Sequence, residues 1–356
     1  MEHNNEENYI KVIAKLINVI IILLIVVVIL IVINITGLPS SKENAEIKFI
    51  PKTKTPETVT ENAASDLWMA PDTSLIKKES NSELIIYGRE LIAHTSVYLG
   101  VKGKIKNLSN GMNCQNCHLE AGTKPFGNNY SGVASTYPKF RERSGSIESI
   151  YKRVNDCFER SLNGNALHTS SKEMQAITAY IKWLGKDVPK GEKPKGAGLT
   201  ELAYLDRAAD PQKGKEVYSF KCKSCHGING EGKLNADGLG YQYPPLWGDR
   251  SYNNGAGLYR LSRFAGYVKS NMPYGTNGES PNLTDEQAWD VAAFVNSQPR
   301  PKKDLSNDWP KIAGKPVDHP FGPYADKFNE QQHKYGPFKE IAELKKNAST
   351  SSATKK

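Results

Sequence analysis

Cysteine is scarce in this chain, with five residues among 356. Four of them fall in two C-x-x-C-H motifs, at residues 114–118 and 222–226, so no disulfide can form within the chain without breaking a motif. In this spacing the two cysteines form thioethers with the haem vinyl groups and the histidine ligates iron. The sequence therefore predicts two covalently bound haem c groups. The expected attachment residues are Cys114, Cys117, Cys222 and Cys225, and the expected proximal iron ligands are His118 and His226.

Long apolar runs are confined to the front of the chain, where residues 16–35 are interrupted only by Asn18 and Asn34. A helix of this length can span the hydrocarbon core of a bilayer. The residues that follow lack the small-residue pattern of a signal-peptide cleavage site, which favours an uncleaved membrane anchor. Lysines flank the run on both sides, so loop charge does not choose an orientation. Because covalent haem is normally installed outside the cytoplasm, we expect residues after 38 on the periplasmic side of the bacterial inner membrane.

The chain also lacks any basic repeat, or basic segment interleaved with aromatic residues, that would support nucleic-acid binding. Its formal net charge is nevertheless +9. One interpretation is a solvated basic surface that aids solubility, and the other is attraction of an anionic substrate or an acidic redox partner. Charge alone does not decide between them.

Two segments look like imperfect copies of one plan. Each begins with a helix-like stretch, at residues 87–91 or 213–217, continues with a haem motif and closes with an amphipathic helix. The capping patterns at residues 170–173 and 284–287 mark the starts of the closing helices. Such helices around a haem are typical of cytochrome c, so the predicted class is all-α, with two cytochrome c-type domains in tandem behind an N-terminal transmembrane helix. The expected parts are a cytoplasmic stub and anchor (1–38), a linker (39–80), the first domain (81–190), a second linker (191–208), the second domain (209–300) and a C-terminal extension (301–356) whose last residues, about ten, are disordered.

The predicted sixth ligand of the second haem iron is Met272. It lies 46 residues after His226, in a loop just before the closing helix. This is where cytochrome c supplies its methionine, and a thioether raises the haem potential. Core packing of Met272 is the other interpretation, and Lys269 is a weaker alternative ligand.

In the first domain three residues compete for the sixth position. Met174 lies on the apolar stripe of the closing helix, where core packing is the simpler interpretation. His168 lies in the preceding loop, where a surface histidine is ordinary. Cys157 lies 39 residues after His118 among basic residues that favour its thiolate. A buried inert thiol and an intermolecular disulfide remain open for Cys157.

Seven short segments together resemble a known family. They are residues 113–123, 137–141 and 153–164 in the first half, and 243–248, 254–257, 271–273 and 298–301 in the second. Across roughly residues 80–340 the chain resembles the dihaem thiosulfate dehydrogenase/tetrathionate reductase family. The resemblance is specific because it includes the lone Cys157 between the two haem motifs.

The resemblance implies that two thiosulfates are joined to tetrathionate with release of two electrons at the first haem, or the reverse. It implies that Cys157 is the distal iron ligand of this catalytic haem. The second haem, held by His226 and Met272, would relay electrons to or from a c-type cytochrome or a membrane electron carrier. Some members use a lysine ligand in place of methionine, but Asn271 occupies that position here, so Met272 is the simpler assignment.

Arg143, Arg153 and Ser161 match substrate-site positions of the family. If the segment is helical, Arg153, Cys157 and Ser161 lie on one face at successive four-residue steps. Fixed guanidinium groups would reduce the repulsion between sulfur dianions and bind sulfonate oxygens in pairs. Arg141 is a weaker additional candidate.

Two other functions compete with this one. A membrane-tethered dihaem electron-transfer cytochrome without its own substrate would need Met or His at both irons and no clustered arginines. A dihaem peroxidase would leave one iron open to peroxide. Cys157 argues against both.

Overall fold

The structure is a computed structural model that describes residue 13 and residues 15–29, 67–276 and 280–353. The chain divides into two compact units, Met1–Asn62 and Ala63–Lys356. Residues 15–29 of the first unit are helical. Among the described residues, no helix combines the length and apolar character needed to cross a membrane. The end of the predicted span, residues 30–35, lies outside the described residues.

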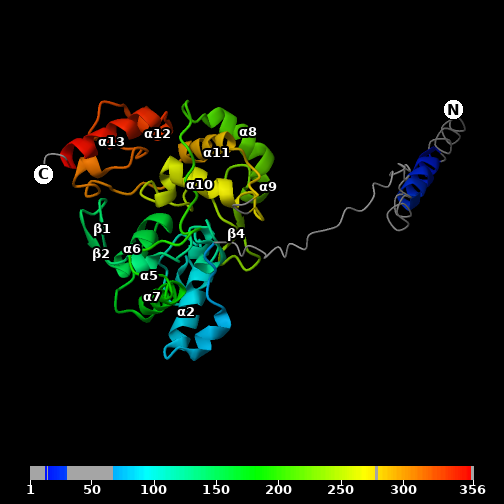
Figure 1. The fold of residues 1–356 in the computed structure, drawn as a ribbon. Helices are drawn as coiled ribbons and strands as arrows, with labels where there is room; N and C mark the ends of the chain where they lie inside the picture. The colour runs from blue at the N-terminus through cyan, green and yellow to red at the C-terminus, as the bar shows by residue number, and fades with distance from the viewer. Residues whose placement is uncertain (1–12, 14, 30–66, 277–279, 354–356) are drawn as a thin grey trace, which may run out of the picture. The chain divides into compact units, whose positions relative to one another are not determined.

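The first haem domain is built on two packed helices, α2 (Ser82–Ala93) and α7 (Lys172–Leu184) (Figure 1). They approach closely because α2 carries Gly88 at the contact, where a Cβ would lie 2.0 Å from the carbonyl oxygen of Ala176. The N-cap of α7 is Ser171, whose hydroxyl accepts from the Met174 amide at 3.2 Å. The helix therefore begins one residue later than the capping pattern predicts.

The second haem domain repeats this pair with α8 (Pro211–Lys221) and α11 (Asp285–Ser297). Gly214 on α8 takes the place of the glycine on α2, and a Cβ there would lie 1.9 Å from the Asp290 carbonyl oxygen. Thr284 and Gln287 form the predicted capping box at the start of α11. The two predicted copies are thus confirmed as two helical domains of one plan.

Shorter elements complete the two domains. The all-α prediction is incomplete, because two antiparallel hairpins join the helices. Their strands have three residues or fewer, too few to produce a recognisable alternation of apolar and polar residues. The helices are α3 (Thr95–Leu99), α4 (Leu119–Gly122), α5 (Val133–Thr136), α6 (Ile150–Asp156), α9 (Lys223–His226) and α10 (Leu261–Asn271), and the strands are β1 (Lys139–Arg141), β2 (Ser146–Glu148), β3 (Lys233–Leu234) and β4 (Tyr241–Tyr243).

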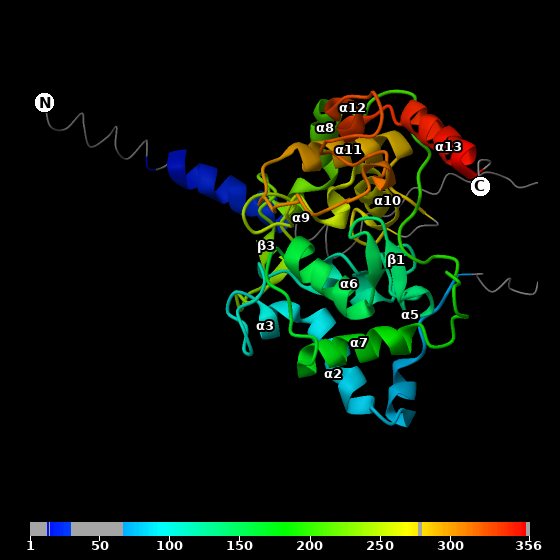
Figure 2. The ribbon, with the colours of Figure 1, turned by 90° about the vertical axis from the view of Figure 1, so that its left-hand side faces the viewer.

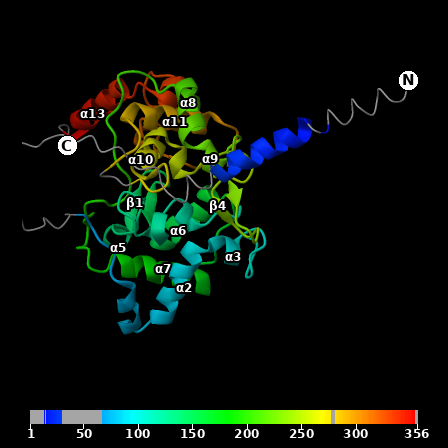
Figure 3. The ribbon, with the colours of Figure 1, turned by 90° about the vertical axis from the view of Figure 1, so that its right-hand side faces the viewer.

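The second linker and α10 are both hydrogen bonded to the first haem domain. The second linker crosses the first haem loop, where the amides of Phe126 and Asn128 donate to the carbonyls of Gly196 and Gly198, each at 2.8 Å. From α10, the side-chain amide of Asn271 donates to the Phe126 carbonyl at 3.0 Å. In Figures 2 and 3, α10 lies on the side of the second domain that faces the first.

The C-terminal extension forms α12 (Glu330–Tyr335) and α13 (Lys339–Ala353), and packs Tyr335, Phe338 and Ile341 into the core of the second domain. The predicted disorder of the last ten or so residues is wrong as far as residue 353, because α13 continues to that point. Lysine, glutamate and alanine from residue 339 onward favour a helix. Residues 354–356 lie outside the described residues.

Candidate functional site

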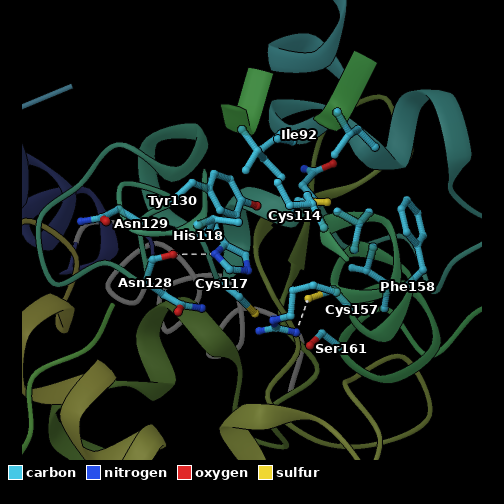
Figure 4. Close-up of a pocket in the computed structure, with 18 residues that line it drawn as sticks. Ile92, Cys114, Cys117, His118, Asn128, Asn129, Tyr130, Cys157, Phe158 and Ser161 are labelled. Carbon is cyan, nitrogen blue, oxygen red and sulfur yellow. Dashed lines mark hydrogen bonds between the residues drawn. The ribbon is translucent and has the colours of Figure 1, made fainter. Parts of the chain in front are cut away.

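The first haem motif lines an apolar cavity in the first domain (Figure 4). Cys114, Cys117 and His118 form part of its wall. The motif loop is held by buried Thr95, whose hydroxyl accepts from the Cys114 amide at 3.0 Å. The wall suits a large apolar ring that is bound through two thiols. Its apolar side chains are Ile92, Val133, Ile150, Val154, Phe158, Leu162, Ile177 and Ile181.

His118 is prepared to ligate a metal. Its Nδ1–H donates to the carbonyl oxygen of Asn128 at 2.5 Å, and the ring of Tyr130 stacks on it at 4.5 Å between centroids. Burial lowers the pKa of His118 to about 4, so the ring is neutral at neutral pH. Because Nδ1 carries the proton, Nε2 keeps a free lone pair, which is the form that binds iron.

Arg153, Cys157 and Ser161 line this same cavity, as expected of residues that share one face. Figure 4 shows Cys157 and Ser161 beside the first haem motif. Arg153 lies on α6, and the chain then passes into a π-helical turn, Cys157–Ser161. Single π-turns inside helices occur frequently at functional sites. The turn presents Cys157 and Ser161 to the space beside the haem motif.

Arg153 and Cys157 are hydrogen bonded. The guanidinium Nη1 donates to the Cys157 sulfur at 3.2 Å. The electrostatic interaction with Cys157 is the main cause that raises the pKa of Arg153, against the opposing effect of burial. A permanent cation therefore lies within hydrogen-bonding distance of the sulfur.

Arg143 does not line the cavity. Its Nη2 donates to Asp156 at 2.9 Å, and Lys152 donates to the other oxygen of the same carboxylate at 2.5 Å. Asp156 is only 2% exposed and ends α6 directly before Cys157. The side chain of Arg143 thus contacts Asp156, which directly precedes Cys157 in the chain.

The second haem motif is built in a similar way. His226 is 8% exposed, and its Nδ1–H donates to the Pro244 carbonyl at 2.8 Å. Burial lowers the pKa of His226, so this ring is also neutral. Met272 follows α10 and packs with Cys222 against the core of the second domain.

The alternative ligands have other contacts in the structure. Lys269 donates to the Leu283 carbonyl at 2.8 Å and pairs with Asp285 at 2.6 Å. Met174 is fully buried in the core, and exposed His168 is hydrogen bonded to Ser170. Cys157 is the one of the three competing first-domain residues that lines the cavity.

Sequence reasoning missed several residues that shape the site. No motif marks Asn128 and Tyr130, which orient His118. For Asp156 the only available signal was the presence of nearby basic residues in the sequence. They are Arg143, Lys152 and Arg160. Its contacts with them become visible only in the fold.

Duplicated helical domains, each with a C-x-x-C-H loop and a neutral histidine whose Nδ1–H is hydrogen bonded, define a dihaem c-type cytochrome. Residues 104–189 match the family model "SoxA/TsdA, cytochrome c domain", and residues 211–299 match the model "Cytochrome c". Together with the relatives below, these matches show that the chain belongs to the thiosulfate dehydrogenase family and carries two c-type haems.

Two relatives are named thiosulfate dehydrogenase. The protein from Psychrobacter arcticus is 37% identical over 243 residues, covering 67% of this chain and 71% of that protein. The protein from Allochromatium vinosum is 38% identical over 235 residues, covering 65% and 83%. The solved structure of thiosulfate dehydrogenase (TsdBA) from Marichromatium purpuratum, in its "as isolated" form, aligns with a TM-score of 0.61 and 29% identity, covering 67% of this chain. This chain spans about half of that one (50%).

Proposed function

We propose that this chain interconverts thiosulfate and tetrathionate beside Cys157, and exchanges the two electrons with a c-type cytochrome or membrane electron carrier. The observation that carries the proposal is the contact of Arg153 with Cys157 inside the cavity of the first haem motif. An electron carrier without a substrate has no need for a cation and a hydroxyl beside a lone thiolate.

The two haem groups supply one-electron redox chemistry when bound. The donor sets suit them, since each offers two thiols and a neutral imidazole. The first group would be held by Cys114, Cys117, His118 and Cys157, and the second by Cys222, Cys225, His226 and Met272.

Arg153 and Ser161 have an electrostatic task in this reaction. Both thiosulfates are dianions, and two unit charges roughly 4 Å apart repel by about 4 kcal/mol near a protein surface. The Arg153 guanidinium offsets part of this repulsion and binds sulfonate oxygens in pairs. Ser161 can donate a further hydrogen bond to the anion.

Joining two thiosulfates transfers two electrons and no proton, so the reaction needs no acid or base. The described cavity agrees with this requirement, because no carboxylate is among its lining residues. Its apolar wall keeps water away and strengthens the field of Arg153.

A thiolate ligand at Cys157 would lower the potential of the first haem, and a thioether at Met272 would raise that of the second. This difference makes the second haem the relay to the external partner. The proposal also includes a membrane anchor at residues 16–35, which would hold the haem domains on the periplasmic side of the bacterial inner membrane. The apolar length of that run and the place where haem is attached support it.

Turnover of the purified full-length holoprotein tests the function. We expect thiosulfate to reduce an artificial acceptor, and tetrathionate to oxidise a reduced donor. A protein with both haems that exchanges electrons with a cytochrome, yet reacts with neither sulfur anion, would establish the substrate-free electron carrier instead.

A further inference from the structure

Two buried side chains of α10 are hydrogen bonded to the first haem loop. The Tyr267 hydroxyl donates to the Asn116 carbonyl at 2.8 Å, and the Asn271 side-chain amide donates to the Phe126 carbonyl at 3.0 Å. Tyr267 is 5% exposed and Asn271 is 1% exposed. Because they lie four residues apart, they share one face of α10, on the side turned toward the first domain (Figures 2 and 3).

The bond from Tyr267 ends inside the first haem motif. Its acceptor Asn116 is covalently joined to Cys117, an expected haem attachment residue. At the other end of α10, the Met272 amide donates to the Val268 carbonyl at 2.9 Å. Val268 directly follows Tyr267 in the chain. Two hydrogen bonds and the covalent bonds between them therefore connect Cys117 with Met272.

Asn271 provides a second connection, which starts at the proximal histidine. The Nδ1–H of His118 donates to the Asn128 carbonyl at 2.5 Å. Two residues earlier in the chain, the Phe126 carbonyl accepts the bond from Asn271. Asn271 is covalently joined to Met272. This connection also contains two hydrogen bonds, and it joins the expected proximal ligand of the first iron to the proposed distal ligand of the second.

Other contacts hold the two domains together, so docking does not depend on these two side chains alone. The Lys124 ammonium donates to the Thr276 carbonyl at 2.9 Å, and the Asn110 side-chain amide donates to the Ser251 carbonyl at 3.1 Å. The linker contributes further backbone bonds. Electrons tunnel more readily through covalent and hydrogen bonds than across a van der Waals gap. Bonds that connect the ligands of two irons therefore couple the irons electronically.

We propose that Tyr267 and Asn271 carry electrons from the first haem to the second along these two hydrogen-bonded connections. The inference rests on the proposed function, in which joining two thiosulfates releases two electrons at the first haem. Each electron passes singly to the second haem, which is reduced as the first is oxidised. No proton moves, and Tyr267 is not itself oxidised, because the carbonyl that accepts its hydrogen bond is not a base for its proton.

The test compares Tyr267→Phe and Asn271→Leu with Tyr87→Phe in the full-length dihaem protein. Tyr87→Phe is the matched control, since it removes a hydroxyl that donates to Glu173 at 3.2 Å within the first domain. A flash-activated reductant injects single electrons in the absence of any sulfur anion, and transient absorption follows their exchange between the two haems. Both haem potentials and KM for thiosulfate are measured for each variant.

We expect the rate of electron exchange between the haems to fall several-fold in Tyr267→Phe and in Asn271→Leu, and further in the double variant. Each substitution keeps the side-chain volume nearly constant, so the packing of α10 should persist. Both potentials and KM should stay at the parent values, because neither side chain lines the first haem cavity. Tyr87→Phe should exchange electrons at the parent rate.

An unchanged exchange rate in the double variant would overturn the inference and indicate direct transfer between the haems. Slower exchange together with a shifted potential of the second haem would also overturn it, since the side chains would then act by positioning Met272. Normal exchange in a parent protein that does not react with thiosulfate would count against the proposed function and leave the electron connections intact.

Discussion

The guanidinium of Arg160 binds the carboxylate of Asp308 at two points, with N–O distances of 2.7 and 2.8 Å. Arg160 belongs to the π-helical turn that presents Cys157, and Asp308 to the C-terminal extension. In the same region the Trp309 amide donates to the Arg143 carbonyl at 2.7 Å. The extension thus braces the turn through Arg160, which does not line the cavity.

Replacing Asp308 by Asn should destabilise the haem domains by about 2 to 3 kcal/mol, because the mostly buried Arg160 would lose its paired carboxylate and keep only Asp156, at 3.9 Å. The midpoint of denaturant unfolding of the holoprotein measures this change. Asp304→Asn is the matched control, since Asp304 is an exposed aspartate of the same extension. Equal midpoints for the two variants would show that the brace contributes nothing.

Replacing Cys157 by Gly should leave both haems attached and abolish thiosulfate turnover, because the thiolate beside Arg153 is lost. Ferric spectra by EPR should lose a low-spin signal of thiolate-ligated haem and keep the signal of the second haem. Full turnover in this variant would refute a role for Cys157 in the reaction.

Replacing Arg153 by Lys should raise KM for thiosulfate by about tenfold or more, since a lysine keeps the charge but cannot offer two parallel donors to a sulfonate. Steady-state kinetics measure the effect. Arg89→Lys, at an exposed arginine of α2, should leave KM unchanged. If both variants behave alike, the paired geometry of Arg153 is not used.

Replacing Met272 by Ala should lower the potential of the second haem, because the proposed thioether ligand, which would stabilise the reduced iron, is removed. Spectroelectrochemical titration measures this potential. Met174→Leu, a change of similar volume in the core, should move neither potential and should cost less than about 1.5 kcal/mol of stability. An unchanged potential in the Met272 variant would require another ligand.

Asp156 should make the stability of the first domain depend on acidity. Burial raises its pKa, but the charges of Arg143, Lys152 and Arg160 outweigh burial and the net pKa is lowered. A carboxylate whose pKa is depressed by folding stabilises the protein at pH above the ordinary aspartate value of about 4, and this contribution is lost as pH falls through the lower folded value.

We therefore expect the denaturant midpoint of the parent protein to decrease as the pH is lowered below about 4. In Asp156→Asn the midpoint should be lower at neutral pH and should fall less with acid. An identical acid dependence in both proteins would show that other carboxylates account for the loss.

The parts of the fold that depend on local chemistry were predictable from sequence. The haem motifs, the helix pairs and the capping box at Thr284 each follow from residues close together in the chain. The shared face of Arg153, Cys157 and Ser161 was expected from helical periodicity, once the resemblance had singled out Arg153 and Ser161, but the π-helical turn was not. Local pattern also misled in the last ten or so residues, where the polar composition predicted disorder and α13 continues to residue 353.

The parts that depend on distant partners were not predictable in this way. Arg143 was expected at the substrate site mainly from the resemblance, and no sequence pattern indicated the contact with Asp156 that the structure shows. Arg160 finds its partner 148 residues away. A single sequence contains no spacing rule for such pairs, and the two short hairpins likewise depend on contacts that tertiary packing provides.

The hydrogen bonds that join α10 and the linker to the first haem loop bear on whether one haem domain could be replaced without affecting the other. The duplicated plan suggests two interchangeable cytochromes, but α10 of the second copy donates hydrogen bonds to the first haem loop, which is also bonded to the linker. Exchange of the second domain for an unrelated monohaem cytochrome would preserve a second haem and remove Tyr267 and Asn271. The two domains therefore depend on each other structurally, although they share one plan, and we expect them to be exchanged only as a pair.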